Sequence, residues 1–576
     1  MKRIHQAIPS SLRSKAYTGF SVLLALGTAA ACGTGGPGEQ TIDANGDGVA
    51  DFLSGPFLDT NSDGRVDAVD RNGDSKSDGV LIDSDGDGIF DSVDQDGDGT
   101  PDGSGGQVNG GSGGNGTGNS NGSGGLVGNS GGSSSGGGGN PDGSGGSTPG
   151  DCQFTITGAP AEQMPTVGVV EFSVTGLPGA VTEGKIEFGL TTEYGMEAPL
   201  DVAAPMYKTL LIGMKKQKMY NYRITASSGG TSCSSENQTI TSGNLRAGIN
   251  DISKSVTGTV GKGFFVVAAK STALIFDQDG DIVWGYAFSA GGVGGTAGIF
   301  AAKMTFDGKY MLARDLGPFN AGNQGKFFRV AMDGSDLKDF DVEGGDHHDF
   351  TIIPTGFAYI AKEAQGGYDK IFTSKDDGTD NKVFADLQPL VMAYPQSQSG
   401  GGMGEMSHVN AIHHWRDRDI YTVSNRESDV IGVVDSAGQI VQAFGKQATA
   451  SFPTVLAEGA GTTWRVQHGH DLYAPDKLLV FSNGNFAGGT SRVLHYTISG
   501  SSATLDWEYS ATGNSATQGD VQMLPDGNIA ITSSAAGNMH VINAAQQLQA
   551  SYGNGAQGFG YATFRTSLYG EPPDGR

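Results

Sequence analysis

Basic residues and long apolar runs are both scarce in this chain of 576 residues. Lysine and arginine number 36 against 62 aspartate and glutamate residues, and the formal net charge is −26. Such a protein would repel a polyanion and release no counterions on binding it, so the charge excludes nucleic acid as a partner. After residue 31 no run is long and apolar enough to form a spanning helix.

The first 31 residues have the features of a secretory signal. Four basic residues precede or begin an apolar run that ends in three alanines before Cys32. A cysteine after small residues, followed by GTGGPG, resembles the lipobox of bacterial lipoproteins. The resemblance implies that residues 1–31 are removed and that Cys32 is lipidated; ordinary signal-peptidase cleavage nearby is the alternative. We therefore expect a periplasmic or cell-surface protein that meets the membrane through a lipid anchor only.

Cysteine is also scarce, with three residues in the whole chain. With Cys32 assigned to the anchor, Cys152 and Cys233 remain as an even pair. An exported protein matures in an oxidising compartment, where such a pair forms a disulfide. We predict a Cys152–Cys233 bond.

Residues 43–103 repeat a short acidic pattern five times, as in DSDGDGIFD. Carboxylates or amides at positions 1, 3, 5 and 9 of each copy, with glycine at the turn, provide the oxygen ligands that Ca²⁺ prefers. The repeats resemble thrombospondin type 3 repeats; a solvated acidic spacer is the alternative. Without calcium the segment is too polar to collapse, and we expect it to be disordered. The predicted Ca²⁺ ligands are Asp43, Asn45, Asp47, Asp51, Asp59, Asn61, Asp63, Asp67, Asp83, Asp85, Asp87, Asp91, Asp94, Asp96, Asp98 and Asp102.

Two further segments precede the largest domain. Residues 104–150 are almost wholly Gly, Ser and Asn, which is the composition of a flexible, disordered linker. Residues 151–245 carry short alternating runs separated by turns, a pattern typical of a small antiparallel sandwich. The stretches KIEFGLTTEYG and LLIGMKKQKMYNYRITA resemble fibronectin type III modules. We expect this sandwich to act as a spacer.

A longer repeat fills residues 248–570. Hairpins such as HDFTIIPTGFAYIAK alternate with second hairpins such as IFTSKDDGTDNKVF, giving six pairs with a period of about 53 residues. Four short strands per period, repeated six times, indicate a radial arrangement in which each blade is buried between its neighbours. The predicted fold class is all-β, with a six-bladed β-propeller as the main domain.

Three histidines occupy one register of this repeat. His348, His408 and His470 each open the first strand of a blade, which in a propeller lines the central channel. We therefore expect the three imidazoles to converge near one mouth of the channel. His468 lies two residues before His470 and is predicted to point to the same face, so the two compete for one role.

Hairpin geometry predicts partners for these histidines. An antiparallel register places His408 opposite Arg426, with Asn410 two residues deeper. The same construction places His348 opposite Lys362, and His470 opposite Ser482 and Asn483. The mouth would then collect imidazole, guanidinium, ammonium and amide groups in an otherwise acidic protein, which favours an anion as ligand. The candidate residues are His348, Lys362, His408, Asn410, Arg426, His468, His470 and Asn483.

Several motifs, which follow one another along the chain, resemble those of the bacterial arylsulfotransferase family, whose members do not use PAPS. They are HHDFTIIPTG, HVNAIHHWRDRDIYTVSNRESDVIGVVD, QHGHDLYAPDKLLVFSNGN, SRVLHYTISG and GDVQMLPDGNIAIT. The resemblance implies transfer of a sulfuryl group from an aryl sulfate to a channel histidine and then to a phenolic acceptor, with no diffusible cofactor for catalysis. It puts the nucleophile in QHGHD, where register favours His470 and the adjacent Gln467 favours His468. His348 or His408 would protonate the leaving phenolate, and Arg426 would hold the sulfuryl oxygens.

Two other functions fit part of the pattern. Three converging histidines can ligate zinc or iron, although nearby Arg426 and Lys362 disfavour a bound cation. A stalk, a sandwich and calcium repeats also suit a non-enzymatic surface propeller that only binds a partner. The sequence leaves both alternatives open.

Overall fold

The computed structural model divides the chain into two compact units, Met1–Gly139 and Asn140–Arg576. The predicted signal segment, Cys32 and the linker lie outside the described residues, as do the predicted calcium ligands except for the backbone of Asp94. Besides four short strands of the first unit, the described residues are 152–288, 298–315, 326–362, 367–394, 407–457, 464–484, 490–511, 513–553 and 558–572.

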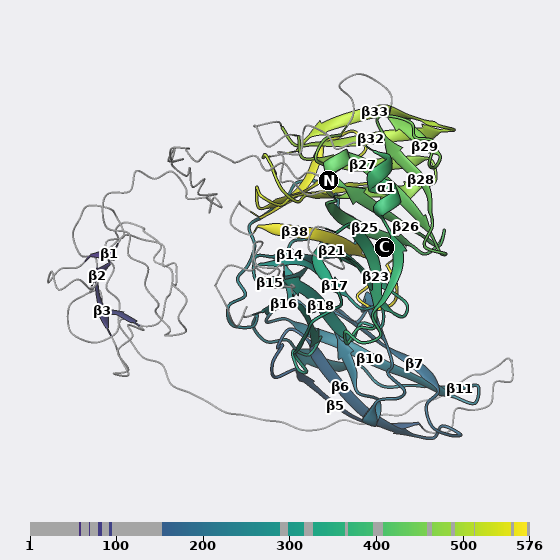
Figure 1. The fold of residues 1–576 in the computed structure, drawn as a ribbon. Coiled ribbons are helices and arrows are strands. Elements are labelled where there is room, and N and C mark those ends of the chain that lie inside the picture. The colour runs from purple at the N-terminus through teal and green to yellow at the C-terminus, as the bar shows by residue number, and fades with distance from the viewer. Residues whose placement is uncertain are drawn as a thin grey trace, which may run out of the picture. The chain divides into compact units, whose positions relative to one another are not determined.

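The described part of the first unit is a small antiparallel sheet, drawn in purple in Figure 1. Each strand follows one acidic repeat and precedes the next. In order along the sheet, the strands are β1 (Phe57–Leu58), β2 (Ala68–Val69), β3 (Gly79–Ile82) and β4 (Ser92–Asp94).

The second unit begins with a β-sandwich. One sheet has the order β5-β6-β9, and the other has β11-β10-β7-β8 with β12 on β10. Strand β10 alternates buried and less buried residues, as expected of a strand with one face on a core. Val170 and Phe172 of one sheet share a core with Phe188 and Ile224 of the other. The strands are β5 (Gln153–Pro160), β6 (Gly168–Thr175), β7 (Glu183–Gly189), β8 (Met196–Pro199), β9 (Thr209–Leu211), β10 (Met219–Ser228), β11 (Thr231–Ser234) and β12 (Gln238–Thr241); η1 (Pro205–Tyr207) is a short 3-10 turn.

A disulfide ties this sandwich together. Cys152, just before β5, is bonded to Cys233 of β11, across a sequence separation of 81 residues. The bond therefore connects the start of the first sheet to an edge strand of the second.

The rest of the unit is a six-bladed β-propeller, as the repeat predicts (Figure 1). Each blade has four antiparallel strands, and the first-named strand of each faces the channel. The blades are β38-β14-β15-β16 (Phe559–Arg565, Phe264–Ala269, Thr272–Asp277, Ile282–Ala287), β17-β18-β19-β20 (Ile299–Met304, Tyr310–Asp315, Phe327–Ala331, Lys338–Phe340), β21-β22-β23-β24 (Gly345–Ile353, Gly356–Lys362, Asp369–Ser374, Lys382–Asp386), β25-β26-β27-β28 (Val409–Trp415, Ile420–Asn425, Val430–Asp435, Ile440–Gly445), β30-β31-β32-β33 (His470–Ala474, Lys477–Ser482, Arg492–Ser499, Ser502–Ser510) and β34-β35-β36-β37 (Asp520–Met523, Ile529–Ser533, Asn538–Ile542, Leu548–Tyr552).

Short elements connect or extend the blades. Strand β13 (Lys254–Val256) pairs with β37, and β29 (Thr454–Ala457) runs parallel to β28 and β33, which merges two blades into one nine-stranded sheet. The helical elements of this part are α1 (Gln388–Ala393) and the 3-10 turn η2 (Arg426–Ser428). None of the helices in the described part of the chain has the length and hydrophobicity that crossing a membrane requires.

The C-terminal strand closes the ring. Strand β38 supplies the inner strand of the blade whose other three strands begin the propeller, and Phe564 pairs with Phe265 of β14. Strands such as β14 (FFVVAA) are buried along almost their whole length because neighbouring blades cover both faces. Closure leaves the propeller with few exposed edges, which protects it from edge-to-edge association.

Carboxylates join the inner strands of neighbouring blades. Asp349 of β21 accepts a hydrogen bond from the backbone N–H of Ile412 in β25 at 3.2 Å, and Asp520 of β34 accepts one from Ala562 in β38 at 3.3 Å. Both aspartates are buried. These bonds fix the relative height of adjacent blades and therefore of side chains that enter the channel.

The sandwich packs against the propeller through a shared core. Met164, Val167 and Ile212 of the sandwich belong to the same buried cluster as Ile275 and Trp284 of the propeller. Beside this core the Nζ of Lys215 lies among three aspartates, one at the end of β15 and two in the turn that follows. The two domains thus form one unit with apolar and ionic contacts between them.

Candidate active site

Three histidines from three successive blades meet in the channel. His348 lies in β21, His408 directly precedes β25, and His468 lies two residues before β30. The Nε2 atoms of His348 and His408 are 3.3 Å apart, and the ring centroids of His348 and His468 are 6.0 Å apart. All three side chains are buried. Two of the three histidines predicted from register are therefore in the cluster, together with His468.

His348 is held in an unusual backbone conformation. Its φ is 63°, in the left-handed region, and it lies in a β-bulge between Asp346 and Phe350. Bulges re-aim side chains, and a strained residue of this kind persists only where its surroundings enforce it. The ring of Phe300 packs edge-on against the imidazole at a centroid distance of 5.9 Å.

The predicted pairing of His348 with Lys362 is wrong. Lys362 is paired with Gly345, because the pairs beside the turn already lie one residue off the predicted register and the bulge between Asp346 and Phe350 shifts it further. The Nζ of Lys362 donates instead to the backbone oxygen of Ser407 at 2.8 Å. Its contact therefore supports the segment that carries His408.

The predicted pairing of His408 with Arg426 is confirmed by the backbone. The N–H of Arg426 donates to the oxygen of His408 at 3.0 Å. Arg426 begins η2, is buried, and forms an ion pair with the buried carboxylate of Glu427. The N–H of His408 donates to Oδ1 of Asn425 at 3.1 Å. Sequence reasoning missed Asn425 and Glu427, although both flank Arg426 in the SNRES segment.

Asn410 links two of the histidine-bearing strands. It lies in a bulge of β25, and its Nδ2 donates to the backbone oxygen of Gln467 at 2.8 Å. The Nε2 of Gln467 donates in turn to Ser424 and to the backbone oxygen of Asn425. These bonds hold the residue before His468 against the blade that carries His408.

The titration of His468 is strongly perturbed. Burial lowers its pKa to about 3; the hydrogen bond with Asn483 opposes this shift, while the charges of Arg426 and His408 add to it. Its Nδ1 lies 2.8 Å from Oδ1 of Asn483. The imidazole is therefore neutral at physiological pH and can act as a nucleophile.

His470 does not take the place that register predicted. It pairs with Val480 rather than with Ser482 and Asn483, since the Ala474–Lys477 turn is tight and a bulge follows it. His470 is fully buried, and its ring lies against His413 at a centroid distance of 4.8 Å. His468 and His470 thus contact different partners, whereas the sequence predicted that they point to the same face.

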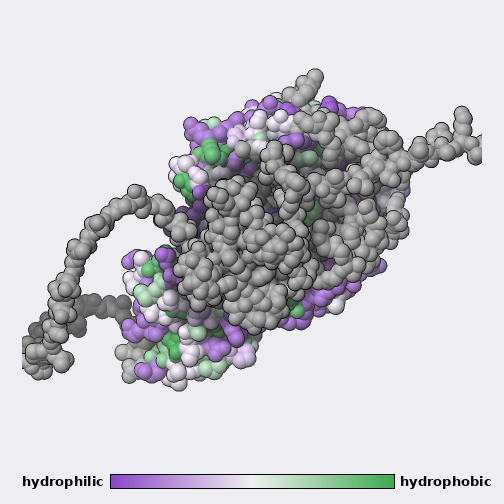
Figure 2. Space-filling model, turned by 90° about the vertical axis from the view of Figure 1, so that its left-hand side faces the viewer, coloured by the Kyte–Doolittle hydropathy of each residue, from purple (hydrophilic) through white to green (hydrophobic). Residues whose placement is uncertain are grey.

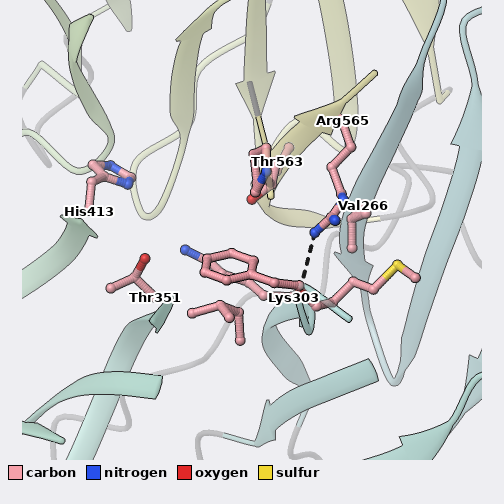
Figure 3. A pocket seen from close by; sticks show the side chains of 11 residues that line it. Val266, Lys303, Thr351, His413, Thr563 and Arg565 are labelled. Carbon is pink, nitrogen blue, oxygen red and sulfur yellow. Dashed lines mark hydrogen bonds between the residues drawn. The ribbon is translucent and has the colours of Figure 1, made fainter. Parts of the chain in front are cut away.

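Further along the inner strands lies a small cavity (Figure 3). His413, Thr351, Lys303, Thr563 and Arg565 are among the residues that line it. Lys303 is paired with Asp349 at 3.1 Å, and Arg565 donates to the backbone oxygen of Met304. The cavity volume of about 20 Å³ is sufficient for about one water molecule, so a phenol does not fit in this cavity.

A metal site of three histidines lacks support from the geometry. Among the described residues, the group of His, Cys, Asp and Glu close enough to hold an ion together is Asp277, Asp279 and Asp281, and the ammonium of Lys215 lies among them.

On the face drawn in Figure 2 the apolar areas of the described residues are small and separated by polar ones.

Comparison with known proteins places the chain in a family. The family model described as arylsulfotransferase (ASST) matches residues 250–561, more than half of the chain. The chain belongs to the arylsulfotransferase family. The matched region is the propeller with its channel histidines, and membership supports aryl sulfotransfer in general, with an aryl sulfate donor and a phenol acceptor as small-molecule substrates.

Other comparisons give weaker likenesses. No curated protein matches the chain. Among solved structures, a nidogen/laminin complex is 12% identical with a TM-score of 0.34, covering 53% of this chain and 98% of that one. Virginiamycin B lyase from Staphylococcus aureus is 14% identical with a TM-score of 0.31, covering 52% and 88%. TolB from Acinetobacter baumannii is 10% identical with a TM-score of 0.33, covering 62% and 80%.

Proposed function

We propose that the propeller transfers a sulfuryl group from an aryl sulfate ester to a phenolic acceptor in two steps, through a sulfohistidine at His468. The observation that carries this proposal is a neutral, buried imidazole flanked by His348, His408 and Arg426. A neutral imidazole attacks sulfur without first losing a proton, and the covalent intermediate divides one difficult transfer into two easier ones.

In the first step a nitrogen of His468 forms a bond to sulfur while the bond between sulfur and the aryl oxygen breaks. The leaving phenolate takes a proton from His348 or His408, whose rings are within hydrogen-bond distance of each other. Arg426 lies close enough to lower the pKa of His468, and its charge stabilises the sulfuryl oxygens and the departing phenolate.

In the second step the acceptor phenol gives its proton back to the same histidine pair. Its oxygen then attacks sulfur, the N–S bond breaks, and His468 returns to the neutral imidazole. The contacts of Lys362 and Asn410 with backbone oxygens suit a role in holding the catalytic segments. No diffusible cofactor enters either step.

The test is a half-reaction with the full-length protein. Incubation with 4-nitrophenyl sulfate in the absence of acceptor should release one equivalent of nitrophenol and add one SO₃ group to the protein mass. Added phenol should then restore steady turnover. The His468→Asn variant should show neither release nor adduct, whereas the matched His470→Asn variant should retain both if it folds as the wild type does.

Two outcomes would contradict the proposal. An adduct mapped to His470 would move the nucleophile, and a full absence of release and adduct across several aryl sulfates would favour a propeller that only binds a partner. Activity that is lost on dialysis against EDTA and restored by zinc or iron would favour a metalloenzyme.

We further propose that this catalytic head works outside the cytoplasm on a tether. The signal-like residues 1–31, the lipobox-like position of Cys32 and the linker at 104–150 support an exported lipoprotein with a mobile stalk. Calcium would order the acidic repeats of that stalk. Transfer of a Cys32→Ser variant from the membrane fraction to the soluble envelope fraction would test the anchor.

A further inference from the structure

Asn483 lies beside the proposed nucleophile at the end of β31. It is buried, and its Oδ1 is 2.8 Å from Nδ1 of His468. Its Nδ2 donates to the backbone oxygen of Ser515 at 2.7 Å and also to that of Gln518. The whole amide group is therefore engaged by protein atoms.

These contacts determine which way the amide points. Both acceptors of the Nδ2 group are carbonyl oxygens, which cannot donate a hydrogen bond. Turning the amide over would place its oxygen against two carbonyl oxygens and its NH₂ group against the imidazole. The oxygen of Asn483 therefore faces His468, and an amide oxygen only accepts.

The orientation of Asn483 in turn determines where His468 carries its hydrogen. A neutral imidazole has one N–H. Nδ1 of His468 lies 2.8 Å from the acceptor oxygen of Asn483, which favours the hydrogen on Nδ1, although the backbone of Val466 also interacts with the ring. We propose that Asn483 is a positioning residue that fixes His468 in the Nδ1–H tautomer, so that Nε2 presents the lone pair that accepts the sulfuryl group. This inference rests on the proposed function for the identity of the nucleophile.

A neutral partner suits this reaction better than a carboxylate. When Nε2 takes the sulfuryl group, the N–S bond forms, the S–O bond breaks, and the ring becomes an imidazolium that still holds its Nδ1 hydrogen. The amide oxygen of Asn483 stabilises that charge without binding the proton. A carboxylate in the same place would also raise the pKa of the resting imidazole and protonate the nucleophile.

The first test determines the tautomer in the wild-type protein, and a substituted sample serves only to assign the resonances. In full-length protein labelled with ¹⁵N-histidine, the His468 resonances are those absent from a His468→Asn sample. We expect one proton-bearing and one bare nitrogen, with the proton on Nδ1. A proton on Nε2 would overturn the inference, and this reading does not depend on whether sulfuryl transfer occurs.

The second test uses the pH dependence of nitrophenol release in the first half-reaction. The wild-type rate should show no acid limb above about pH 4, since the pKa of His468 is about 3; a fall at higher pH would report loss of the proton that His348 or His408 gives to the phenolate. In Asn483→Asp the pKa should rise by about one to three units, and an acid limb should appear at correspondingly higher pH. An unchanged profile in a variant with wild-type folding would contradict the inference. Asn237→Asp, on the exposed surface of the sandwich, is the matched control.

The third test uses the variant Asn483→Leu, which removes the oxygen that accepts from His468 and fills its space. The rate of the sulfuryl-transfer step should fall about tenfold to a hundredfold with little change in the donor KM, and the tautomer signal should become mixed. If the tautomer is as expected but no variant or wild-type sample forms an adduct, the proposed function fails while the assignment of Asn483 stands. A single tautomer retained in Asn483→Leu would overturn the assignment.

Discussion

Replacing Lys215 by methionine should weaken the contact between the sandwich and the propeller. The Nζ of Lys215 lies 3.0, 2.9 and 2.6 Å from carboxylate oxygens of Asp277, Asp279 and Asp281. Burial lowers the pKa of Lys215, but the three carboxylates together raise it above its ordinary value. Burial also raises the pKa of Asp277 in spite of the ammonium beside it. Methionine would fill the space and leave that carboxylate without its cation.

The expected cost follows from the exposure of the groups. Breaking a fully buried ion pair costs about 3–5 kcal/mol. The Lys215 side chain is 23% exposed, and those of Asp279 and Asp281 are 55% and 38% exposed, so solvent screens part of the cluster. We expect a loss of about 2–3 kcal/mol at neutral pH. The adjacent Lys216 pairs with Asp251 at 41% and 62% exposure, so Lys216→Met should cost at most about 1 kcal/mol.

Urea unfolding of the full-length variants, followed by tryptophan fluorescence, would measure the difference. In Lys215→Met the buried Asp277 has a folded-state pKa above its unfolded value, and its cost grows as the pH rises through the carboxyl range. The deficit of Lys215→Met should therefore be largest at pH 7 and shrink as the carboxyls become protonated. Equal losses from the two lysine variants, or a deficit of Lys215→Met that is independent of pH, would refute this reasoning.

Three further predictions concern the sandwich, the channel and the stalk. Replacing Cys152 and Cys233 by alanine should destabilise the sandwich by about 4.5 kcal/mol, the loop-entropy value for a separation of 81 residues, as measured by urea unfolding with and without reductant. At position 348, where φ is 63°, His348→Gly should unfold at higher temperature than His348→Ala, by an amount equivalent to about 1 kcal/mol, and the reverse order would argue against backbone strain there. A peptide of residues 43–103 should bind Ca²⁺ with dissociation constants of about 10⁻⁴ to 10⁻³ M and become ordered by circular dichroism, whereas Mg²⁺ at the same concentration should not order it.

The blade repeat could be predicted because it depends on local patterns. Several hairpins in the propeller join two apolar runs through a turn rich in Gly, Asp or Pro, as in DVQMLPDGNIAITS of β34 and β35. The pairing of β38 with β14 could not be found in this way. It joins residues near the two ends of the propeller, and no short-range signal marks a strand that pairs across almost the whole domain.

The histidine cluster was predicted in part, and bulges account for the difference. Counting outward from a turn assumes that residues pair one to one. A bulge between Val409 and Ala411 brings His408 to Arg426, whereas bulges between Asp346 and Phe350 and between Asp471 and Ala474 move His348 and His470 away from their predicted partners. At His470 the tight turn and the bulge act together, so that His470 pairs with Val480 and His468 lies in the cluster instead. Bulges are common beside active sites, so register fails most easily where function depends on it.

An acidic protein with an anionic substrate presents an apparent conflict, which the distribution of charge resolves. Residues 43–103 hold 17 aspartates and three basic residues, so this segment contributes −14 of the net −26. Charges separated by more than about 8 Å in solvent are largely screened at physiological ionic strength. A sulfate ester inside the channel therefore responds to nearby groups, above all Arg426, whose charge is strong enough to lower the pKa of buried His468. Burial keeps the proposed nucleophile neutral, and the charge of Arg426 adds to that effect while attracting the group that the imidazole would attack.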